Sequence, residues 1–277
     1  MPELPEVEVT RRSIADRLNG ARVHAARLGK PLRWPLGIAP EALVGATLGL
    51  TLRRGKYLWL PLERATDAGS GGLLLHLGMS GSLALSDAPA AAGPHDHFEL
   101  ATSGGTLRLT DPRRFGAVVW SDALDAAPAS ALLAKLGPEP FDPALTPLSL
   151  HAALQRRRAP IKQVLLAGDA VVGAGNIYAC EALHRAGIDP RTRAEKLSRP
   201  RTARLLDAIR ATLARALELG GSTLRDFRDA HGLSGAFQDE TRVYGREGQA
   251  CPRCGTAVRR IVQAQRSSFF CPGCQKR

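Results

Sequence analysis

Short apolar or alternating runs dominate the chain between about residues 21 and 120. Examples are KYLWLPL, GGLLLHLGMSGSLAL and GAVVWS, and the segments between them are rich in Gly, Ser, Pro and Asp. Alternating runs bounded by turn residues are typical of β-strands, and many short strands in succession favour a sandwich or a barrel. We therefore predict an all-β N-terminal domain of the sandwich type.

A helix is predicted before these strands, over residues 5–19. Pro5 suits a first helical position, and Glu6 suits the positive end of the helix dipole. The apolar residues that share one face of this helix are Val7, Ile14 and Leu18. The helix does not explain why the tip of the chain, a place where sequences are usually indifferent, carries Pro2 and Glu3.

The hydrophobic period changes to that of helices from Leu148 onward. The runs LSLHAALQRRR, PIKQVLLAG, NIYACEALHRAG and RPRTARLLDAIRATLARALELGG each close on Gly or on basic residues, as helices do. Between the two patterns, Asp122–Thr146 is rich in Ala and Pro and indicates a surface crossing to a new domain. Phe227–Phe237 is polar and carries two glycines, so we predict a mobile loop there.

These changes of pattern predict an α+β chain with more than one domain, as its 277 residues also suggest. The predicted parts are a β-sandwich with a leading helix, a linker, a helical domain and a C-terminal ribbon, over residues 1–125, 126–147, 148–237 and 238–277. The sequence has no run of 18 or more apolar residues and no secretory leader, so we expect a cytoplasmic protein that does not enter membranes.

Four cysteines near the C-terminus have the spacing C-x2-C-x16-C-x2-C; they are Cys251, Cys254, Cys271 and Cys274. Each pair can present two thiolates to a tetrahedral ion, and four thiolates with no open position indicate one structural Zn²⁺. Disulfides are the alternative. The segment between the pairs is predicted as a hairpin that presents Arg266 at its turn. Cys180 falls in an apolar helix, where a buried thiol is expected.

Basic residues are concentrated in the second half of the chain. Residues 1–150 hold 15 basic and 15 acidic residues, whereas residues 151–277 hold 23 and 11, so the whole net charge of +12 lies there. Arginine supplies most of this excess, and its planar fork suits phosphate oxygens. A polyanion such as nucleic acid is therefore the natural partner.

Several motifs, taken together and in order, resemble one family over nearly the full length. They are PELPEVE at the start, RGKYL at Lys56, HLGMSGSL at His76, DPRRFG at Asp111, VVGAGNIYACEALHRAGI at Val171, VYGREG at Val243 and the four-cysteine ribbon. The family is bacterial formamidopyrimidine-DNA glycosylase, a bifunctional enzyme that excises oxidised purines. The resemblance implies an N-terminal β-sandwich, a helix–two-turns–helix domain and a zinc ribbon, with damaged double-stranded DNA in the cleft.

The resemblance also implies a chemistry for the tip of the chain. In the family the mature protein begins at proline, which implies that Met1 is removed here to free the amine of Pro2. An α-amino group has a pKa near 7.7–8.0, so this secondary amine can attack the sugar as a nucleophile. Glu3 is the implied general acid and base, Lys56 a proton donor that contacts phosphate, and Arg266 the ribbon residue that assists the late elimination.

A base inside the duplex must be flipped out to react, and the gap that it leaves must be filled. The resemblance implies a wedge of Met79, Arg113 and Phe115, and a lid at Asp229–Gly235 over the everted base. The implied phosphate contacts are His76, His95, Arg157, Lys162, Asn176 and Tyr178, with Glu6 and Glu181 in support. The chain has Arg156–Arg158 where the family often carries lysines, which puts the contact at Arg157 in doubt.

Two other functions fit parts of the sequence. An endonuclease VIII-like enzyme would use the same proline chemistry on oxidised pyrimidines, although the PELPEVE start and the complete wedge set resemble the purine branch. A non-enzymatic zinc-ribbon DNA-binding protein would explain the basic second half equally well. We expect a monomer that is associated with the bacterial nucleoid.

Overall fold

The computed structural model describes residues 2–64, 69–223 and 229–277. The chain divides into two compact units. The first comprises Met1–Ala134 and Leu219–Ala236, and the second comprises Lys135–Glu218 and Phe237–Arg277. Within these described ranges no helix is long and apolar enough to cross a membrane.

Helix α1 (Leu4–Leu18) opens the first unit, close to the predicted range. Glu3 is its N-cap and forms a capping box with Glu6, which satisfies backbone N–H groups that a helix start leaves without partners. The helix buries a full apolar face that includes Val7, Ile14 and Leu18. The tip of the chain is therefore a structured helix start and not a frayed end.

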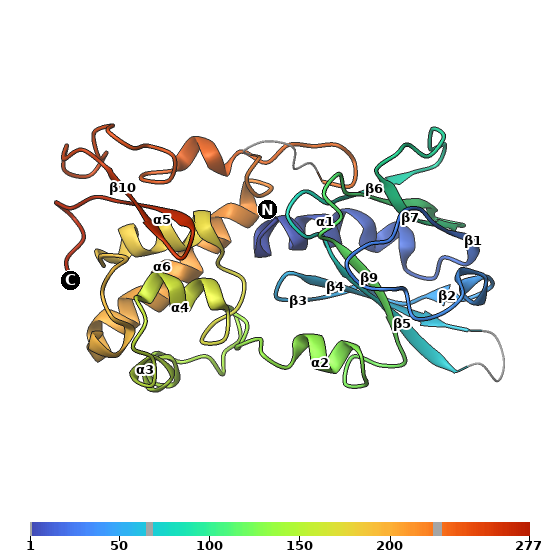
Figure 1. The fold of residues 1–277 in the computed structure, drawn as a ribbon, viewed down its shortest axis with the longest axis horizontal. Coiled ribbons are helices and arrows are strands. Elements are labelled where there is room, and N and C mark those ends of the chain that lie inside the picture. Colours follow the sequence, from blue (N-terminus) through green and yellow to red (C-terminus); the bar gives the residue numbers. More distant parts are fainter. Residues whose placement is uncertain (1, 65–68, 224–228) are drawn as a thin grey trace. The chain divides into compact units, whose positions relative to one another are not determined.

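Two antiparallel sheets form the β-sandwich of the first unit (Figure 1). One has the order β2-β4-β5-β9, with β3 paired to β4; these strands are β2 (Thr47–Leu48), β3 (Leu52–Arg54), β4 (Tyr57–Glu63), β5 (Ser70–His76) and β9 (Ala117–Ser121). The other has the order β1-β7-β8-β6; these strands are β1 (Val23–Leu28), β6 (Ser82–Ser86), β7 (Asp96–Thr102) and β8 (Gly105–Thr110). The all-β prediction for this region is confirmed.

One apolar core joins the two sheets and α1. It gathers leucines from both sheets, such as Leu60 and Leu109, with Phe98 and the apolar face of α1. The opposite face of the first sheet buries Trp59 and Leu74 against a second cluster, which includes Ala129 of the short helix α2 (Ala129–Leu133). Both faces of this sheet are thus covered. A 3-10 turn, η1 (Pro40–Leu43), adds Leu43 to the core.

The second unit is helical, as predicted. Its helices are α3 (Pro147–Gln155), α4 (Ile161–Ala167), α5 (Asn176–Ala186) and α6 (Arg199–Glu218), with short 3-10 turns η2 (Ala194–Lys196) and η3 (Phe237–Glu240). Gly168 and Gly187 end α4 and α5 in the left-handed conformation that favours glycine at a helix end. The ribbon pairs β10 (Arg259–Gln263) with β11 (Arg266–Phe270).

The segment Leu219–Ala236 belongs to the first unit, whereas the predicted helical domain ran to residue 237. Ala230 is buried in the sandwich core, its N–H donates to Ser13 Oγ (3.4 Å) and its carbonyl accepts from Leu85 N (3.1 Å). The predicted loop Phe227–Phe237 falls partly on residues 224–228, which lie outside the described residues. Its remainder is anchored at Ala230, so the prediction of an unpacked loop is wrong there.

Gly72 on β5 offers a test of how tightly the sandwich is packed. A Cβ at this position would lie 2.5 Å from Trp59 Cζ2 and 2.6 Å from Leu60 O. We expect Gly72→Ala to lower the free energy of unfolding by about 1–3 kcal/mol through overpacking. Gly93→Ala is the matched control because its Cβ would meet only Asp96 Oδ2, at 3.6 Å.

Urea unfolding followed by tryptophan fluorescence measures this effect, because all three tryptophans lie in the first unit. A midpoint for Gly72→Ala equal to that of Gly93→Ala would contradict the packing argument.

Candidate active site

The tip of the chain is immobilised by one buried carboxylate. Glu6 is 2% exposed, and its Oε2 accepts from Glu3 N (2.7 Å) while its Oε1 accepts from Ser222 N (2.8 Å). Pro2 and Glu3 are buried beside it. Gly221 has a φ of 83°, and a Cβ there would lie 2.9 Å from Glu6 Oε1, so only glycine fits at this approach. Glu6 therefore joins the start of the chain to the segment at Ser222.

Lys56 occupies a tight turn between two strands. The strands β3 and β4 pair Arg54 with Tyr57, which leaves Gly55 and Lys56 as a two-residue hairpin loop. Gly55 takes the φ of 59° that such loops require at their first position. The turn carries the lysine on a rigid hairpin at the end of the first sheet.

His76 ends β5 close to Lys56. Its ring lies 4.7 Å from the ring of Tyr57, and its Nδ1 accepts from Gly78 N at 3.0 Å. Burial, followed by the charges of Lys56 and Arg33, lowers the pKa of His76 to about 4. The ring is therefore neutral at pH 7, and because Nδ1 accepts, the proton sits on Nε2, where it can be donated to a phosphate oxygen.

The three predicted wedge residues lie on two adjacent loops of the first unit. Met79 is 39% exposed, Phe115 is 49% exposed and Arg113 is also exposed. Large apolar side chains are normally buried when they serve a core. Their exposure on loops fits residues that act on a partner.

His95 is exposed just before β7. Its carbonyl accepts from Asp111 N (2.9 Å), which ties it to the loop that carries Arg113 and Phe115. His95 and His76 are the two histidines of the first unit that were predicted to contact phosphate.

Lys162 is completely buried at the start of α4, contrary to the phosphate contact predicted for it. Its ammonium group donates hydrogen bonds of 2.6–2.8 Å to Asn176 Oδ1, Ser267 O and Ser268 Oγ. These three hydrogen bonds use the N–H donors of the ammonium group that a phosphate would need. Lys162 instead ties α4 and α5 to the ribbon strand that begins at Arg266.

Asn176 opens α5 and completes this network. Its Nδ2 donates to Ser267 O (3.0 Å) and to Tyr244 Oη (3.4 Å). The Asn176 side chain therefore joins α5 to the ribbon in this structure.

Tyr178 and Arg157 were also predicted to contact phosphate, but neither side chain is fully exposed. Tyr178 is fully buried, with its ring 5.0 Å from that of Phe237. Arg157 is half-buried and pairs with Asp169 through Nη2 at 2.8 Å. A phosphate contact at Arg157 would have to compete with this ion pair. This ion pair is therefore a second argument against a phosphate contact at Arg157, besides the arginines at 156–158.

Arg266 is exposed at the first position of β11, next to the ribbon turn, as predicted. It pairs with Gln263 across the turn residues Ala264 and Gln265, whose φ values are 46° and 61°. Residues other than glycine seldom adopt this left-handed conformation, so the turn is strained. Such strain is retained where the surrounding structure fixes it and is frequent at functional sites.

Glu181 on α5 holds the segment that leads into the ribbon. Its carboxylate accepts from the backbone N–H groups of Arg242, Val243 and Tyr244 at 2.8–3.0 Å. Burial raises its pKa in spite of these bonds. Glu181 therefore fixes the VYG segment to α5.

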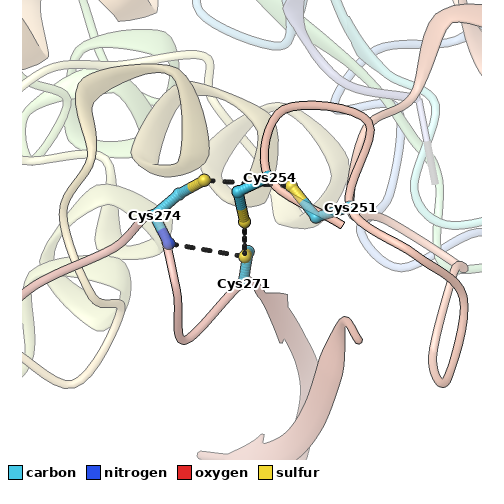
Figure 2. A group of neighbouring side chains, drawn as sticks. All are labelled: Cys251, Cys254, Cys271 and Cys274. Atoms are coloured by element: carbon cyan, nitrogen blue, oxygen red, sulfur yellow. Dashed lines mark hydrogen bonds between the residues drawn. The ribbon is translucent and has the colours of Figure 1, made fainter. Parts of the chain in front are cut away.

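The four ribbon cysteines converge as Figure 2 shows, with their sulfur atoms within 4.8 Å of one another. Cys251 and Cys274 are 3.9 Å apart, and Cys254 and Cys271 are 3.4 Å apart. A tetrahedral site with Zn–S bonds of about 2.3 Å has sulfur–sulfur distances of about 3.8 Å. These distances exclude disulfides, and the cluster fits one structural zinc ion.

Cys180 is separate from this cluster and is buried in α5. Burial raises the pKa of its thiol to about 11, so the group is inert at neutral pH. The burial of this thiol agrees with the prediction from the apolar helix around Cys180.

Some residues that organise the site were not singled out from the sequence. Ser267 and Ser268 accept from Lys162, and Asp111 lies beneath the loop of Arg113 and Phe115. The Asp-Pro pair at Asp111 is a turn signal that points to this position. No sequence signal marks the serines, because their role depends on pairing between distant elements.

Three family models match successive parts of the chain. They are the formamidopyrimidine-DNA glycosylase N-terminal domain over residues 1–118, its H2TH domain over residues 136–228, and the zinc finger found in FPG and IleRS over residues 248–277. The order is that of the sandwich, the helices and the ribbon.

Known proteins match over the whole length. Formamidopyrimidine-DNA glycosylase of Variovorax paradoxus is 58% identical over 276 residues and all of both chains. MutM (FPG) from Thermus thermophilus, which has a crystal structure, is 39% identical in sequence. Its fold matches with a TM-score of 0.88 over 99% of this chain and 98% of that one. MutM in complex with DNA containing carbocyclic 8-oxo-G is 34% identical, with a TM-score of 0.87 over all of both chains.

The fold and the four-cysteine cluster define a DNA glycosylase with a C-terminal zinc ribbon. The chain belongs to the formamidopyrimidine-DNA glycosylase family. It is a base-excision-repair enzyme of the kind that combines glycosylase with abasic-site lyase activity.

The buried ammonium of Lys162 leads to a stability prediction. Lys162→Gln shortens the side chain and leaves buried acceptors without a donor, so we expect a loss of about 2–4 kcal/mol in the free energy of unfolding. Thermal unfolding measures it, with Lys135→Gln, an exposed lysine of the same unit, as control. Equal melting temperatures for the two variants would contradict the role given to Lys162.

The lowered pKa of His76 leads to a prediction for the stability of the protein at acidic pH. Above pH 6.5 the ring is neutral in the folded and the unfolded chain. Between pH 6.5 and about 4 only the unfolded chain takes up the proton, so the free energy of unfolding decreases as pH falls through this range and levels off below the folded pKa. We expect this loss to reach about 1–3 kcal/mol.

Nitrogen-15 NMR of the imidazole measures this directly, with His76→Gln to assign the signal. The expected spectrum has the Nε2–H tautomer at pH 7 and a titration midpoint near 4. A midpoint near 6.5 would show that the ring is not desolvated as described.

Proposed function

We propose that this enzyme excises oxidised purines such as 8-oxoguanine and formamidopyrimidines from double-stranded DNA and then cleaves the strand. The observation that carries the proposal is the immobilised tip, where Glu6 fixes the residues beside the predicted nucleophile. A solved MutM of the same fold holds DNA that contains carbocyclic 8-oxo-G, which supports this substrate class for the chain.

The reaction begins with the free amine of Pro2. Met1, which lies outside the described residues, must first be removed. The amine nitrogen then attacks C1′ of the damaged nucleotide, and the bond from C1′ to the base breaks as the base leaves with a proton. Opening of the sugar ring leaves an iminium, which is permanently cationic because proline is a secondary amine. The cation draws electrons from the sugar and makes β- and then δ-elimination possible.

Glu3 supplies and removes the protons of these steps. Its position next to Pro2 in the chain keeps the carboxyl close to the sugar during the reaction, and the capping box keeps the backbone at Glu3 from moving. Ring opening needs a proton on O4′, and elimination needs a base at C2′. One positioned carboxyl can serve both steps in turn.

Cations and neutral donors then hold the DNA. Lys56 on its hairpin turn and the Nε2–H of His76 would contact phosphates beside the lesion from the first unit. Arg266 would contact flanking phosphates from the ribbon and assist the late elimination, with Lys162 as the group that holds its strand in place. The structural zinc ion supplies rigidity to the ribbon.

The damaged nucleotide has to leave the stack before Pro2 can reach C1′. Met79 and Phe115 would fill and kink the duplex at the gap, and Arg113 would bond to the orphaned base. The anchored part of Asp229–Gly235 would cover the everted base. We further propose that the enzyme acts as a monomer in the cytoplasm, at the nucleoid.

Borohydride trapping tests the proposal. Protein that begins at Pro2, as checked by mass spectrometry, is expected to form a covalent complex with duplex DNA that holds 8-oxoguanine opposite cytosine. A variant that retains one residue before Pro2 is the matched control. It is expected to lose trapping while its affinity for the duplex stays within about twofold, since the phosphate contacts remain.

Three outcomes would contradict the proposal. Trapping by the extended variant would assign the nucleophile to another amine. Cleavage of thymine-glycol DNA with 8-oxoguanine DNA left intact would assign the enzyme to oxidised pyrimidines. Binding without cleavage of any lesion would favour a non-enzymatic DNA-binding protein.

A further inference from the structure

The two loops that carry the predicted wedge are packed backbone against backbone. We call residues 77–81 the first wedge loop and residues 111–116 the second. Gly78 has a φ of 63°, and a Cβ there would lie 2.5 Å from both Gly116 N and Phe115 C. The contact is too close for any side chain at Gly78, so the spacing between Met79 and Phe115 is set by backbone contact.

A single carboxylate lies beneath both loops. Asp111 is completely buried. Its Oδ1 accepts from Ser80 Oγ (2.6 Å) and from Arg113 N (3.3 Å), and its Oδ2 accepts from Gly116 N (2.7 Å). One side chain thus fixes the residue after Met79 and both ends of the segment that holds Phe115.

The hydroxyl of Ser80 extends this arrangement to the side chain of Arg113. Ser80 Oγ accepts from Arg113 Nε at 3.1 Å while it donates to Asp111. Because the hydroxyl has one proton, donation to the carboxylate leaves its lone pairs to receive the guanidinium. The result is a directed chain from Arg113 through Ser80 to Asp111.

The backbone of Asp111 is itself held, by residues at the start of β7 and by its own loop. Its backbone N–H donates to His95 O (2.9 Å), and its carbonyl accepts from Arg114 N (3.2 Å) and lies 3.1 Å from the Nε2 of the buried His97. The carboxylate is therefore fixed relative to the sandwich, whereas the groups that it binds all belong to the wedge loops.

We propose that Asp111 and Ser80 are positioning residues that make Met79, Arg113 and Phe115 enter the duplex as one rigid wedge. The inference rests on the proposed function, because it assigns the three exposed residues to the gap left by the everted base. Intercalation must offset the cost of unstacking. A wedge whose three parts are already aligned loses less conformational entropy on insertion than three independent side chains would.

The chemistry of the two residues suggests selective variants. Asp111→Asn keeps the shape but places an amide nitrogen where one of the three donors now finds an oxygen. Ser80→Ala removes only the hydroxyl that joins Arg113 to Asp111, and Ser80 is partly exposed, so its loss leaves the core intact. Ser86→Ala, at the end of β6, is the matched control for serine removal.

The experiment compares two substrates under single-turnover conditions. One is a duplex with 8-oxoguanine opposite cytosine and 2-aminopurine next to the lesion, so that stopped-flow fluorescence reports unstacking. The other is a single-stranded oligonucleotide with an abasic site, which has no base to evict and no gap to fill. Melting temperatures confirm folding, and Ser80→Ala carries the test if Asp111→Asn does not fold.

We expect Asp111→Asn and Ser80→Ala to slow the 2-aminopurine step and duplex excision by about 10- to 100-fold, as misplacement of a positioned group does. Cleavage of the single strand should stay within about twofold, and the double variant should be little worse than Asp111→Asn because both act in one chain of bonds. Ser86→Ala should match the wild type on both substrates.

Equal losses on the two substrates would overturn the inference, since they would show a general structural or chemical defect. Unchanged rates on both would overturn it as well. Failure of the wild-type protein to cleave either substrate is a different result, because it refutes the proposed function before any variant is compared.

Discussion

The hydrogen bonds of the Glu6 carboxylate are the constraint on which the catalytic tip depends. A helix start leaves four backbone N–H groups without partners, and the end of a chain has no neighbour to restrain it. Glu6 binds the N–H of Glu3 with one oxygen and that of Ser222 with the other. A residue in the first turn of α1 thereby joins the start of the chain to a segment more than two hundred residues away.

Buried carboxylates accept hydrogen bonds from backbone N–H groups near other predicted functional residues as well. Glu181 accepts hydrogen bonds from three backbone N–H groups before the ribbon, and Asp111 accepts hydrogen bonds from the backbone of the second wedge loop. A carboxylate that is bonded to several N–H groups offsets much of its desolvation cost, because charge-assisted hydrogen bonds are strong. The enzyme thus uses buried acidic residues to fix the loops that a basic surface could not order by itself.

The sequence allowed the main elements to be predicted where the signal was local. Helix α1 was expected at residues 5–19 and lies at Leu4–Leu18, and the cysteine spacing gave the zinc cluster. Predictions failed where a side chain's position depends on distant partners. Lys162 is a cation in a basic stretch by sequence, yet its acceptors come from α5 and from β11, so its burial could not be read from its neighbours.

The net charge of +12 also overstates the cations that remain for DNA. In the basic half of the chain Arg157 pairs with Asp169, Arg191 with Asp189, and Arg215 with Glu240. These ion pairs reduce the number of counterions that DNA binding can release, and therefore the salt dependence that a charge count suggests. Long-range attraction follows from the total charge, whereas selection of a lesion depends on the few groups, such as Arg266, that the buried network holds in place.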